Sequence, residues 1–263
     1  MKKNGAVLTL AAGVVVSILM AARFVLASPT ANAATQRVYV DQGFYVAHGV
    51  GPRAVVVLHS LGHEWTEGPA QGWSALADSK RFLAIYPQAQ EGRGSWNAGL
   101  CCGDAMRTNR NDVLFLARVI ADARARYRLT TIYVAGYSNG GMMAERLLSE
   151  RPWLSARLAV FGAAPEMPAP GTWPGRGFLL HGALDTTVPW RGGKVTLDPE
   201  LCRIVLGVTP RLVKECGGTY LMRPGQATPS FLKGARLSAT VLPNWGHRPP
   251  SNWPAWAWSK LST

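Results

Sequence analysis

The sequence predicts an α/β fold in which a mostly parallel sheet carries helices on both faces. Short apolar runs rich in Val, Ile, Leu and Phe alternate along the chain with segments whose apolar residues recur at helical spacing. This alternation is typical of a parallel sheet, because each parallel strand needs a crossover connection and a helix usually supplies it. Apolar runs without polar alternation also indicate strands that are buried on both faces.

Composition supports a globular chain and excludes several function classes. The 263 residues include 48% hydrophobic and 16% charged residues, which excludes intrinsic disorder. Four cysteines are too few for a small disulfide scaffold. The formal net charge is +13, yet the basic residues are spread from Arg37 to Lys260 without a long run. Nucleic-acid binding requires a clustered basic patch, so we expect no nucleic-acid partner.

Residues 1–33 resemble a signal peptide. Lys2 and Lys3 form a basic start, residues 5–22 are uncharged, and Ala31-Asn32-Ala33 offers a small-residue cleavage site. Cleavage would release residues 34–263, which we expect to form a single catalytic domain that is secreted and makes no stable membrane contact. The alternative is an uncleaved anchor at the outer face of a membrane, because the apolar stretch is close to the ~20 residues that span a bilayer. The sequence leaves the oligomeric state open.

The predicted strands follow from continuous apolar runs that end at turn residues. Phe82–Tyr86 is expected to end at Pro87, because proline lacks the N–H that a ladder needs. Between residues 191 and 242 the periodicity is poor, and only one late strand is predicted there. In chain order the predicted strands are Arg37–Val46 (a strand or hairpin), Ala54–Leu58, Phe82–Tyr86, Thr131–Ala135, Leu158–Phe161, Gly177–His181 and Ala239–Leu242.

Three segments have helical patterns. Residues 72–79 have a helical pattern, and residues 142–149 form a second helical segment after a glycine-rich turn. Between them, Asp112 is placed to cap a longer helix. The apolar residues of that helix fall on one face, and they are Val113, Leu116, Ile120, Ala123 and Tyr127.

Residues 136–140 form a G-x-S-x-G motif that indicates nucleophilic catalysis. The motif lies between a predicted buried strand and a predicted helix, where glycines permit the strained turn that raises a serine hydroxyl above a sheet. Ser138 is therefore the candidate nucleophile. The backbone N–H of Asn139 would lie at a helix N-terminus and could donate to an oxyanion. The alternative interpretation is a glycine-rich turn with a capping serine.

A serine hydroxyl needs a base and an acid that orients the base. The chain order associated with this motif is Ser, acid, His. Among five histidines, His247 is the one that comes late enough, since His48, His59 and His63 precede the serine and His181 ends a predicted strand. Asp185 follows that strand and is the expected acid, with Asp198 as the alternative.

The second oxyanion donor should come from the loop after an earlier central strand, which is His59-Ser60-Leu61-Gly62. We favour the backbone N–H of Leu61, and Ser60 is the alternative. Gly62 would let the chain turn closely.

Together these motifs resemble secreted polyhydroxybutyrate depolymerase-like esterases, a group related to feruloyl esterases in the α/β-hydrolase superfamily. The resemblance implies an α/β-hydrolase fold with Ser138, Asp185 and His247 as nucleophile, acid and base. The chain departs from the family at Ser60, where a glycine is usual, and after His247, where Arg248 replaces a threonine. Residues 191–242, where much of the substrate pocket is expected, align poorly. The matching segments are Leu58–Gly62, Ser95–Gly103, Gly136–Met143, His181–Pro189 and Gly246–His247.

The cysteines fit an exported protein, in which disulfides persist. Cys202 and Cys216 are the preferred pair. Cys101 and Cys102 could form a vicinal bridge, or each could pair with a distant partner. A zinc site is not expected, because the spacing lacks C-x-x-C and a matching pair of histidines.

Ten tryptophans are many for this length, and most are expected to pack in the core. Trp96 and Trp245 lie next to motif segments and are the candidates for the wall of a substrate pocket. Trp253, Trp256 and Trp258 cluster near the end of the chain.

We therefore expect a serine esterase that hydrolyses carboxylic esters through an acyl-enzyme, without a metal or an organic cofactor. The expected substrate is a short hydroxyalkanoate oligomer or another small soluble ester. The alternative enzyme is a feruloyl or acetyl esterase that acts on plant polysaccharide. An alternative of another class is a catalytically silent protein that binds a ligand or a cell-surface partner.

Overall fold

The computed structural model describes residues 36–90, 94–99, 101–163, 172–191, 193–195, 220–222 and 234–263. The predicted signal peptide, Asp198, Cys202 and Cys216 lie outside these ranges. Within them, no helix is both long and apolar enough to cross a membrane.

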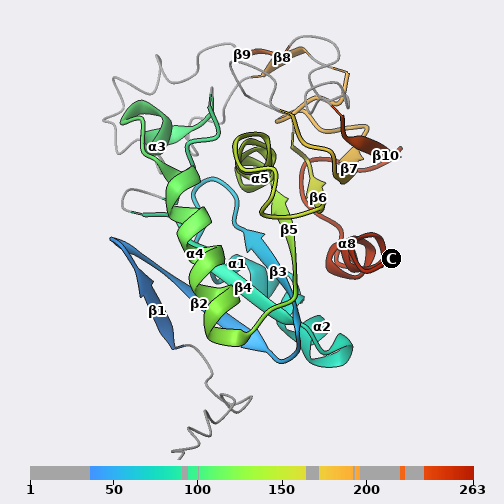
Figure 1. The fold of residues 1–263 in the computed structure, drawn as a ribbon. Helices are drawn as coiled ribbons and strands as arrows, with labels where there is room; N and C mark the ends of the chain where they lie inside the picture. Colours follow the sequence, from blue (N-terminus) through green and yellow to red (C-terminus); the bar gives the residue numbers. More distant parts are fainter. Residues whose placement is uncertain are drawn as a thin grey trace, which may run out of the picture.

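One eight-stranded sheet forms the centre of the described structure, with the order β1-β2-β4-β3-β5-β6-β7-β10 (Figure 1). β2 pairs antiparallel with both β1 and β4, and the other neighbours in this sheet are parallel. The α/β-hydrolase fold, with a mostly parallel sheet, is therefore confirmed. The strands are β1 (Arg37–Val40), β2 (Gly43–Gly49), β3 (Arg53–Leu58), β4 (Leu83–Gln88), β5 (Thr131–Tyr137), β6 (Arg157–Phe161), β7 (Arg176–Gly182) and β10 (Arg236–Leu242). A separate antiparallel pair joins β8 (Gly193–Val195) to β9 (Tyr220–Met222).

β3 illustrates why the continuous apolar runs become central strands. It lies between β4 and β5, so its backbone groups are paired on both sides. Val56 and Leu58 pack into the core on one face of the sheet, and Val55 and Val57 pack into the core on the other. Both faces are buried, and the run therefore needs no polar alternation.

Helices cover both faces of the sheet, as the alternating pattern predicts. α4 (Asp112–Tyr127) and α5 (Asn139–Glu150) contribute to the core on one face. α2 (Trp73–Lys80) and α8 (Trp253–Leu261) contribute to the core on the other (Figure 1). Two short helices, α1 (Glu67–Ala70) and α3 (Gly103–Arg107), were not predicted from the sequence.

Two predicted boundaries are wrong. Asn111, and not Asp112, caps α4, since the Oδ1 atom of Asn111 accepts from the backbone N–H of Leu114 at 3.0 Å. Asp112 is instead a fully buried residue of the first turn. β4 also continues through Pro87 to Gln88. Its pairing with β3 ends at Ile85, so the last residues of β4 pair with β2 alone and a missing N–H is tolerated.

The tryptophans near the end of the chain pack, as predicted. In α8, Trp258 stacks on Phe82 with ring centroids 4.2 Å apart, and Trp253 meets the edge of Trp73 at 6.1 Å. These contacts hold α8 against α2 and against the residue that precedes β4. Because β3, β5 and β7 are parallel strands of one sheet, the loops that follow them lie at the same edge of that sheet.

Candidate active site

Ser138 lies at the sharp turn between β5 and α5. Its backbone has φ 52° and ψ −123°, a conformation that residues other than glycine rarely adopt. The backbone N–H of Ser138 donates to the carbonyl of Phe161 at 2.9 Å, which fixes the turn against β6. A Cβ at Gly140 would collide with the carbonyl oxygens of Leu58 and His59. The motif glycine therefore allows the start of α5 to approach the end of β3.

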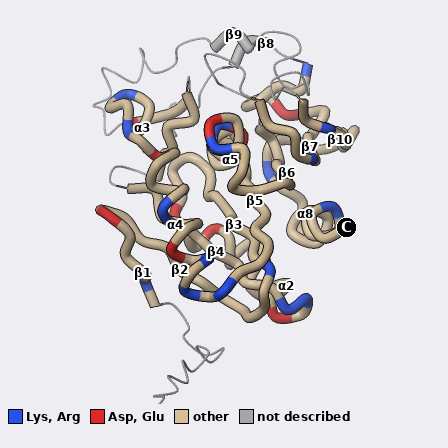
Figure 2. Tube along the Cα trace, viewed as in Figure 1, with Lys and Arg blue, Asp and Glu red and all other residues tan. Residues whose placement is uncertain are grey.

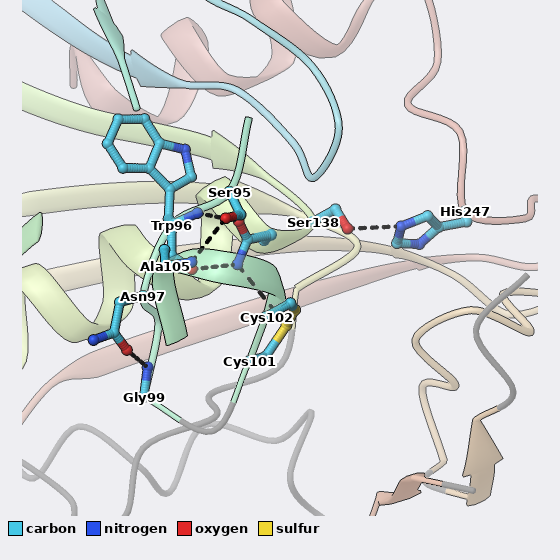
Figure 3. The surroundings of a disulfide bond; sticks show 10 residues. Ser95, Trp96, Asn97, Gly99, Cys101, Cys102, Ala105, Ser138 and His247 are labelled. Carbon is cyan, nitrogen blue, oxygen red and sulfur yellow. Dashed lines mark hydrogen bonds between the residues drawn. A yellow bond between two sulfur atoms is a disulfide. The ribbon is translucent and has the colours of Figure 1, made fainter. Parts of the chain in front are cut away.

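The structure brings Ser138, His247 and Asp185 together as the chain order predicts. The Nε2 atom of His247 lies 2.9 Å from the Oγ atom of Ser138 (Figure 3). The Nδ1 atom of His247 lies 2.7 Å from Oδ2 of Asp185. A hydroxyl, an imidazole and a carboxylate in this connected order can pass a proton from the serine to the histidine.

The carboxylate of Asp185 is buried and well supplied with hydrogen-bond donors. Its Oδ1 atom accepts from the backbone N–H groups of Thr187 at 2.9 Å and Val188 at 2.7 Å. Burial alone would raise the pKa of Asp185, but hydrogen bonds from His181, His247 and the Val188 N–H outweigh it and lower the pKa to about 2. Asp185 is therefore anionic at neutral pH and can stabilise a charged His247.

A second histidine, His181, contacts the same carboxylate. It is 1% exposed, and its Nε2 atom lies 2.6 Å from the carbonyl oxygen of Val188 and 3.3 Å from Oδ2 of Asp185. A carbonyl can only accept, so Nε2 of His181 carries a proton. Sequence reasoning gave His181 no role, although its position four residues before Asp185 in one motif was a usable signal.

Two backbone N–H groups, those of Asn139 and Leu61, have no acceptor among the described residues and are candidates to bind an oxyanion. Asn139 is the first residue of α5, and its N–H therefore has no acceptor within the helix. In the preceding loop, the N–H of Ser60 donates to Glu67 at 2.7 Å and that of Gly62 donates to Gly94 at 2.9 Å. The N–H of Leu61 between them has no acceptor among the described residues. Of the two residues considered for the second donor, the geometry therefore favours Leu61.

Trp96 does not line a pocket, and the predicted substrate contact by its side chain is wrong. Trp96 is 0% exposed, and its indole N–H donates to the carbonyl of His59 at 3.0 Å. Its backbone N–H and carbonyl bond to the side-chain amide of Asn139 at 2.8 and 3.0 Å. Trp96 thus holds His59 through its indole and Asn139 through its backbone.

Trp245 lies in a different setting. It is 41% exposed and stands two residues before His247, with its indole N–H directed to the carbonyl of Arg248. Its backbone carbonyl accepts from the N–H of Leu184 at 2.9 Å, which places it beside the loop that carries Asp185. A substrate contact by Trp245 stays a prediction.

The structure pairs Cys101 with Cys102 next to this site (Figure 3). A vicinal disulfide, one of the two arrangements that the sequence left open, stays a prediction. The Nδ2 atom of Asn139 lies 3.8 Å from the Sγ atom of Cys101, so the pair borders the start of α5. The other predicted pair, Cys202 with Cys216, is outside the described residues.

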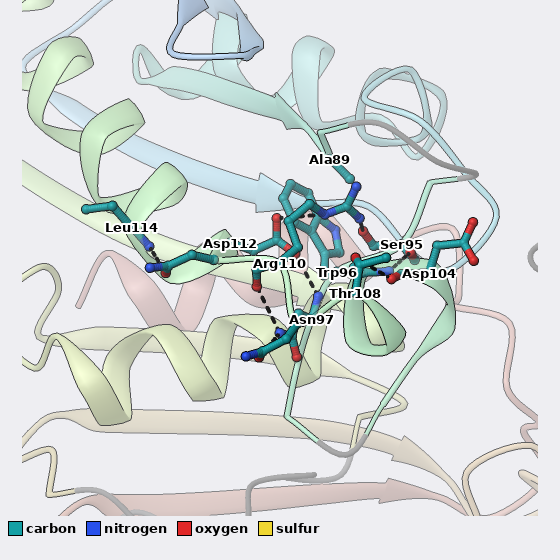
Figure 4. Close-up of polar contacts among 12 residues, drawn as sticks. Ala89, Ser95, Trp96, Asn97, Asp104, Thr108, Arg110, Asp112 and Leu114 are labelled. Atoms are coloured by element: carbon teal, nitrogen blue, oxygen red, sulfur yellow. Dashed lines mark hydrogen bonds and ion pairs between the residues drawn. The ribbon is translucent and has the colours of Figure 1, made fainter.

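A polar cluster that the sequence did not reveal holds the segment before the two cysteines (Figure 4). The buried carboxylate of Asp112 accepts from the backbone N–H of Asn97 at 2.7 Å. The guanidinium of Arg110 donates to the carbonyl of Ser95 at 2.7 Å and lies 3.5 Å from Asp112. Burial raises the pKa of Asp112, while the bond from Asn97 and the charge of Arg110 oppose that shift. The cluster therefore fixes Ser95 and Asn97, the residues before and after Trp96 in the chain.

Within the described part of the chain, no three or more His, Cys, Asp and Glu side chains gather as a metal-binding group. The polar residues beside Ser138 instead have contacts that suit proton transfer and backbone hydrogen bonding.

Comparison with known proteins agrees with this geometry. No protein-family model matches the chain. It is 28% identical over 118 residues to poly(3-hydroxyalkanoate) depolymerase C of Paucimonas lemoignei. The matched segment covers 42% of this chain and 28% of the depolymerase. It is 24% identical over 163 residues to a bifunctional acetylxylan esterase/xylanase of Neocallimastix patriciarum, which covers 57% of this chain and 22% of that protein. The chain thus spans less than a third of the length of either relative.

Solved structures share the fold at low sequence identity. A carboxylesterase from Mesorhizobium loti has a TM-score of 0.56 and 15% identity, with 87% of this chain and 99% of that chain covered. An acetyl xylan esterase from Aspergillus awamori has a TM-score of 0.55 and 14% identity, with 84% and 99% covered. The chain is therefore an α/β-hydrolase-fold protein with distant sequence similarity to a polyhydroxyalkanoate depolymerase and an acetylxylan esterase.

Proposed function

We propose that the chain is an exported serine esterase that cleaves carboxylic esters through an acyl-enzyme. The observation that carries this proposal is the unbroken hydrogen-bonded series from Ser138 through His247 to Asp185. The backbone N–H groups of Asn139 and Leu61 have no acceptor in the described part of the chain, and they lie on the two segments that meet at Gly140. A nucleophile, its base and two donors for an oxyanion are what acyl transfer requires.

In the first half of the reaction, the Oγ atom of Ser138 attacks the ester carbonyl carbon and its proton moves to Nε2 of His247. Asp185 holds the Nδ1–H of the imidazole and stabilises its positive charge. The tetrahedral oxyanion accepts from the N–H groups of Asn139 and Leu61. The bond to the alcohol oxygen then breaks, and His247 gives its proton to the leaving alcohol.

In the second half, water attacks the acyl-enzyme and gives a proton to His247. A second tetrahedral oxyanion forms at the same donors and collapses, and the proton returns to Oγ of Ser138. The products are a carboxylic acid, an alcohol and the regenerated enzyme. None of these steps requires a cofactor.

For the substrate, we propose short hydroxyalkanoate oligomers or other small soluble aliphatic esters. The similarity to poly(3-hydroxyalkanoate) depolymerase C supports this class. The similarity to an acetylxylan esterase favours acetyl esters on a polysaccharide as the second candidate. We expect kcat/KM to be higher for a hydroxybutyrate trimer than for acetylated xylo-oligosaccharides, methyl ferulate or crystalline polymer. Faster turnover of either of the other soluble esters would replace the proposed substrate class.

Export and disulfide formation complete the proposal. Protein from culture supernatant should begin near Ala34 and show no free thiols when it is alkylated under denaturing conditions. Intact Lys2 and Lys3 in a membrane fraction would support the anchor instead. Peptide mapping that joins Cys202 to Cys101 or Cys102 would contradict both proposed cysteine pairs.

Hydrolysis of p-nitrophenyl acetate tests catalysis against the alternative of a silent binding protein. The wild-type protein should turn over the ester, while Ser138→Ala and His247→Ala should each lose about 10⁵- to 10⁶-fold in kcat. The double variant should lose little more than either single variant, because the groups act as a unit. Ser79→Ala, which removes an exposed helical hydroxyl, is the matched control. A wild-type protein without turnover would favour the silent alternative.

A further inference from the structure

The loop after β3 contains one residue whose polar atoms are all engaged. Residues 59–62, here called the oxyanion loop, include Ser60, whose backbone N–H donates to Oε2 of Glu67 at 2.7 Å. The hydroxyl of Ser60 donates to the other oxygen, Oε1, at 2.8 Å. One carboxylate therefore binds one residue twice. Glu67 is the first residue of α1, and its side chain is 11% exposed.

The carbonyl of Ser60 is held from the other side. It accepts from Nδ1 of His59 at 2.9 Å and from the backbone N–H of His63 at 3.3 Å. The Nε2 atom of His59 accepts from the N–H of Ala89 at 3.2 Å, so the ring proton is on Nδ1. Burial lowers the pKa of His59 to about 4, which keeps this neutral form at neutral pH.

These contacts determine the direction of the Leu61 N–H. The carbonyl of Ser60 and the N–H of Leu61 belong to one planar peptide unit and point in opposite directions. Whatever fixes the carbonyl of Ser60 therefore also aims the N–H of Leu61. Glu67 fixes the preceding peptide unit and the side chain, so Ser60 cannot rotate without breaking hydrogen bonds.

The double contact depends on the residue type at position 60, because the second bond comes from the serine hydroxyl. A glycine would keep the backbone bond to Glu67 but would lack the hydroxyl bond. Glycine also has more conformational freedom than serine, so the substitution loosens the loop in two ways.

We infer that Glu67 is a positioning residue that aims the Leu61 N–H at the oxyanion through its two hydrogen bonds to Ser60. This role rests on the proposed esterase function, because it concerns the stabilisation of the tetrahedral intermediate. A donor in an oxyanion hole is effective only when it is already in place as the charge develops. Tyr137, the residue before Ser138, also feels the carboxylate of Glu67. Its pKa is raised by burial first and by the charge of Glu67 second.

The test compares three substitutions in and beside α1 with p-nitrophenyl acetate as substrate. Glu67→Ala removes both bonds and should reduce kcat by about 10- to 100-fold with KM within about 3-fold of wild type. Glu67→Gln can accept from the Ser60 N–H and donate to its hydroxyl, so kcat should stay within about 3-fold. Glu64→Ala, which removes an exposed carboxylate three residues before Glu67, is the control and should match wild type.

A second readout separates positioning from a general loss of structure. Benzeneboronic acid adds to the catalytic serine as a tetrahedral anion, and its inhibition constant should rise in Glu67→Ala by the same factor as kcat falls. Ser60→Gly provides a variant with a smaller change, and it should lose about 3- to 10-fold in both quantities. Melting temperatures of all variants are measured alongside.

Several results would overturn the inference. One is an unchanged kcat in Glu67→Ala and Ser60→Gly. Another is an equal loss in Glu67→Ala and Glu67→Gln, which would assign the effect to charge and not to position. A third is a change in KM alone. The wild-type protein distinguishes the two proposals, because an inactive wild type contradicts the esterase function, whereas an active wild type with unaffected variants contradicts only the role of Glu67.

Discussion

The oxyanion loop and the loop that carries Asp185 flank the same serine but are held in different ways. Residues 182–189, here called the acid loop, contain the carboxylate of Asp185, the proposed acid, which accepts from Thr187 and Val188. The oxyanion loop presents a backbone N–H, which cannot organise its own surroundings, and it depends on Glu67, Ala89 and Gly94. A local motif therefore specifies the turn at Thr187 and Val188, although Ala183 and Leu184 also bond to the distant carbonyls of Leu242 and Trp245. The oxyanion loop has no such carboxylate of its own and depends on residues outside it.

A buried histidine lies where each loop leaves its strand. His59 follows β3 and is 2% exposed, and His181 belongs to β7 and is 1% exposed. Each bonds to a carbonyl of its own loop, Ser60 in one case and Val188 in the other. His181 also contacts the charged acid, while His59 stays neutral and positions only backbone. Disturbing the acid loop should therefore affect the charge of the site, and disturbing the oxyanion loop should affect its geometry.

The largest difference is expected from the acid itself. Asp185→Asn keeps the shape of the side chain but removes the charge that fixes the His247 tautomer, so kcat should fall by about 10⁴-fold. The acid loop should also loosen, because an amide oxygen is a weaker acceptor for Thr187 and Val188. Steady-state kinetics on p-nitrophenyl acetate measures the loss. A decrease of less than 10-fold would remove Asp185 from the proposed triad.

On the oxyanion side, Trp96→Ala should act on stability as well as on rate. It leaves a large cavity beside His59, and the free energy of unfolding should fall by about 3–5 kcal/mol. The loss of the indole bond and ring contact to His59, the first residue of the oxyanion loop, should lower kcat/KM by about 10- to 100-fold. Urea unfolding monitored by circular dichroism and steady-state kinetics provide the two values. Unchanged stability would contradict the buried position of the indole.

Substitutions of the two buried histidines, His59 and His181, should have smaller effects on kcat and can be compared directly. His181→Gln retains a hydrogen-bond donor for the carbonyl of Val188 but removes the contact with the carboxylate of Asp185. We expect kcat to fall by about 5- to 30-fold and the acid limb of the pH–rate profile to shift. His59→Gln should lower kcat by a similar factor without moving that limb, because the ring nitrogens of His59 bond only to backbone groups among the described residues. A shifted acid limb of the pH–rate profile in the His59 variant would show that His59 and His181 do not have distinct roles.

The smallest effect concerns stability in acid. The pKa of Asp185 is lowered from 3.8 to about 2 in the folded protein. Its contribution to stability is therefore fully present above pH 4 and is lost as the pH falls from 4 through 2. Asp185→Asn should flatten the pH dependence of the melting temperature across this window. A profile identical to that of the wild type would indicate that the carboxylate is not held as the structure shows.

Much of the fold and of the site could be predicted from the sequence, for local reasons. Continuous β-branched runs such as residues 54–58 predict buried strands without knowledge of their neighbours. Ser138 is marked by glycines on both sides, and the chain order leads to Asp185 and His247. The helix α8 could also have been recognised, because its buried residues 253, 254, 257, 258 and 261 have helical spacing.

Other features depend on contacts that no local pattern encodes. Glu67 reaches Ser60 only because α1 follows the oxyanion loop, and a four-residue helix is too short to show a periodic pattern. Trp96 adjoins a motif in the same way whether it lines a pocket or packs beneath one, so its burial could not be read from the sequence. Asp112 resembles a helix cap in sequence, and its bond to Asn97 exists only in the folded chain.

The central claim is that Ser138 is the nucleophile of an acyl-transfer site, and labelling with a fluorophosphonate tests it most directly. The serine Oγ atom displaces fluoride from phosphorus, so intact mass spectrometry should show one adduct per wild-type chain and peptide mapping should place it on Ser138. Ser138→Ala should show no adduct and a melting temperature near that of the wild type. An adduct on another residue, or none on a folded wild-type protein, would contradict the account.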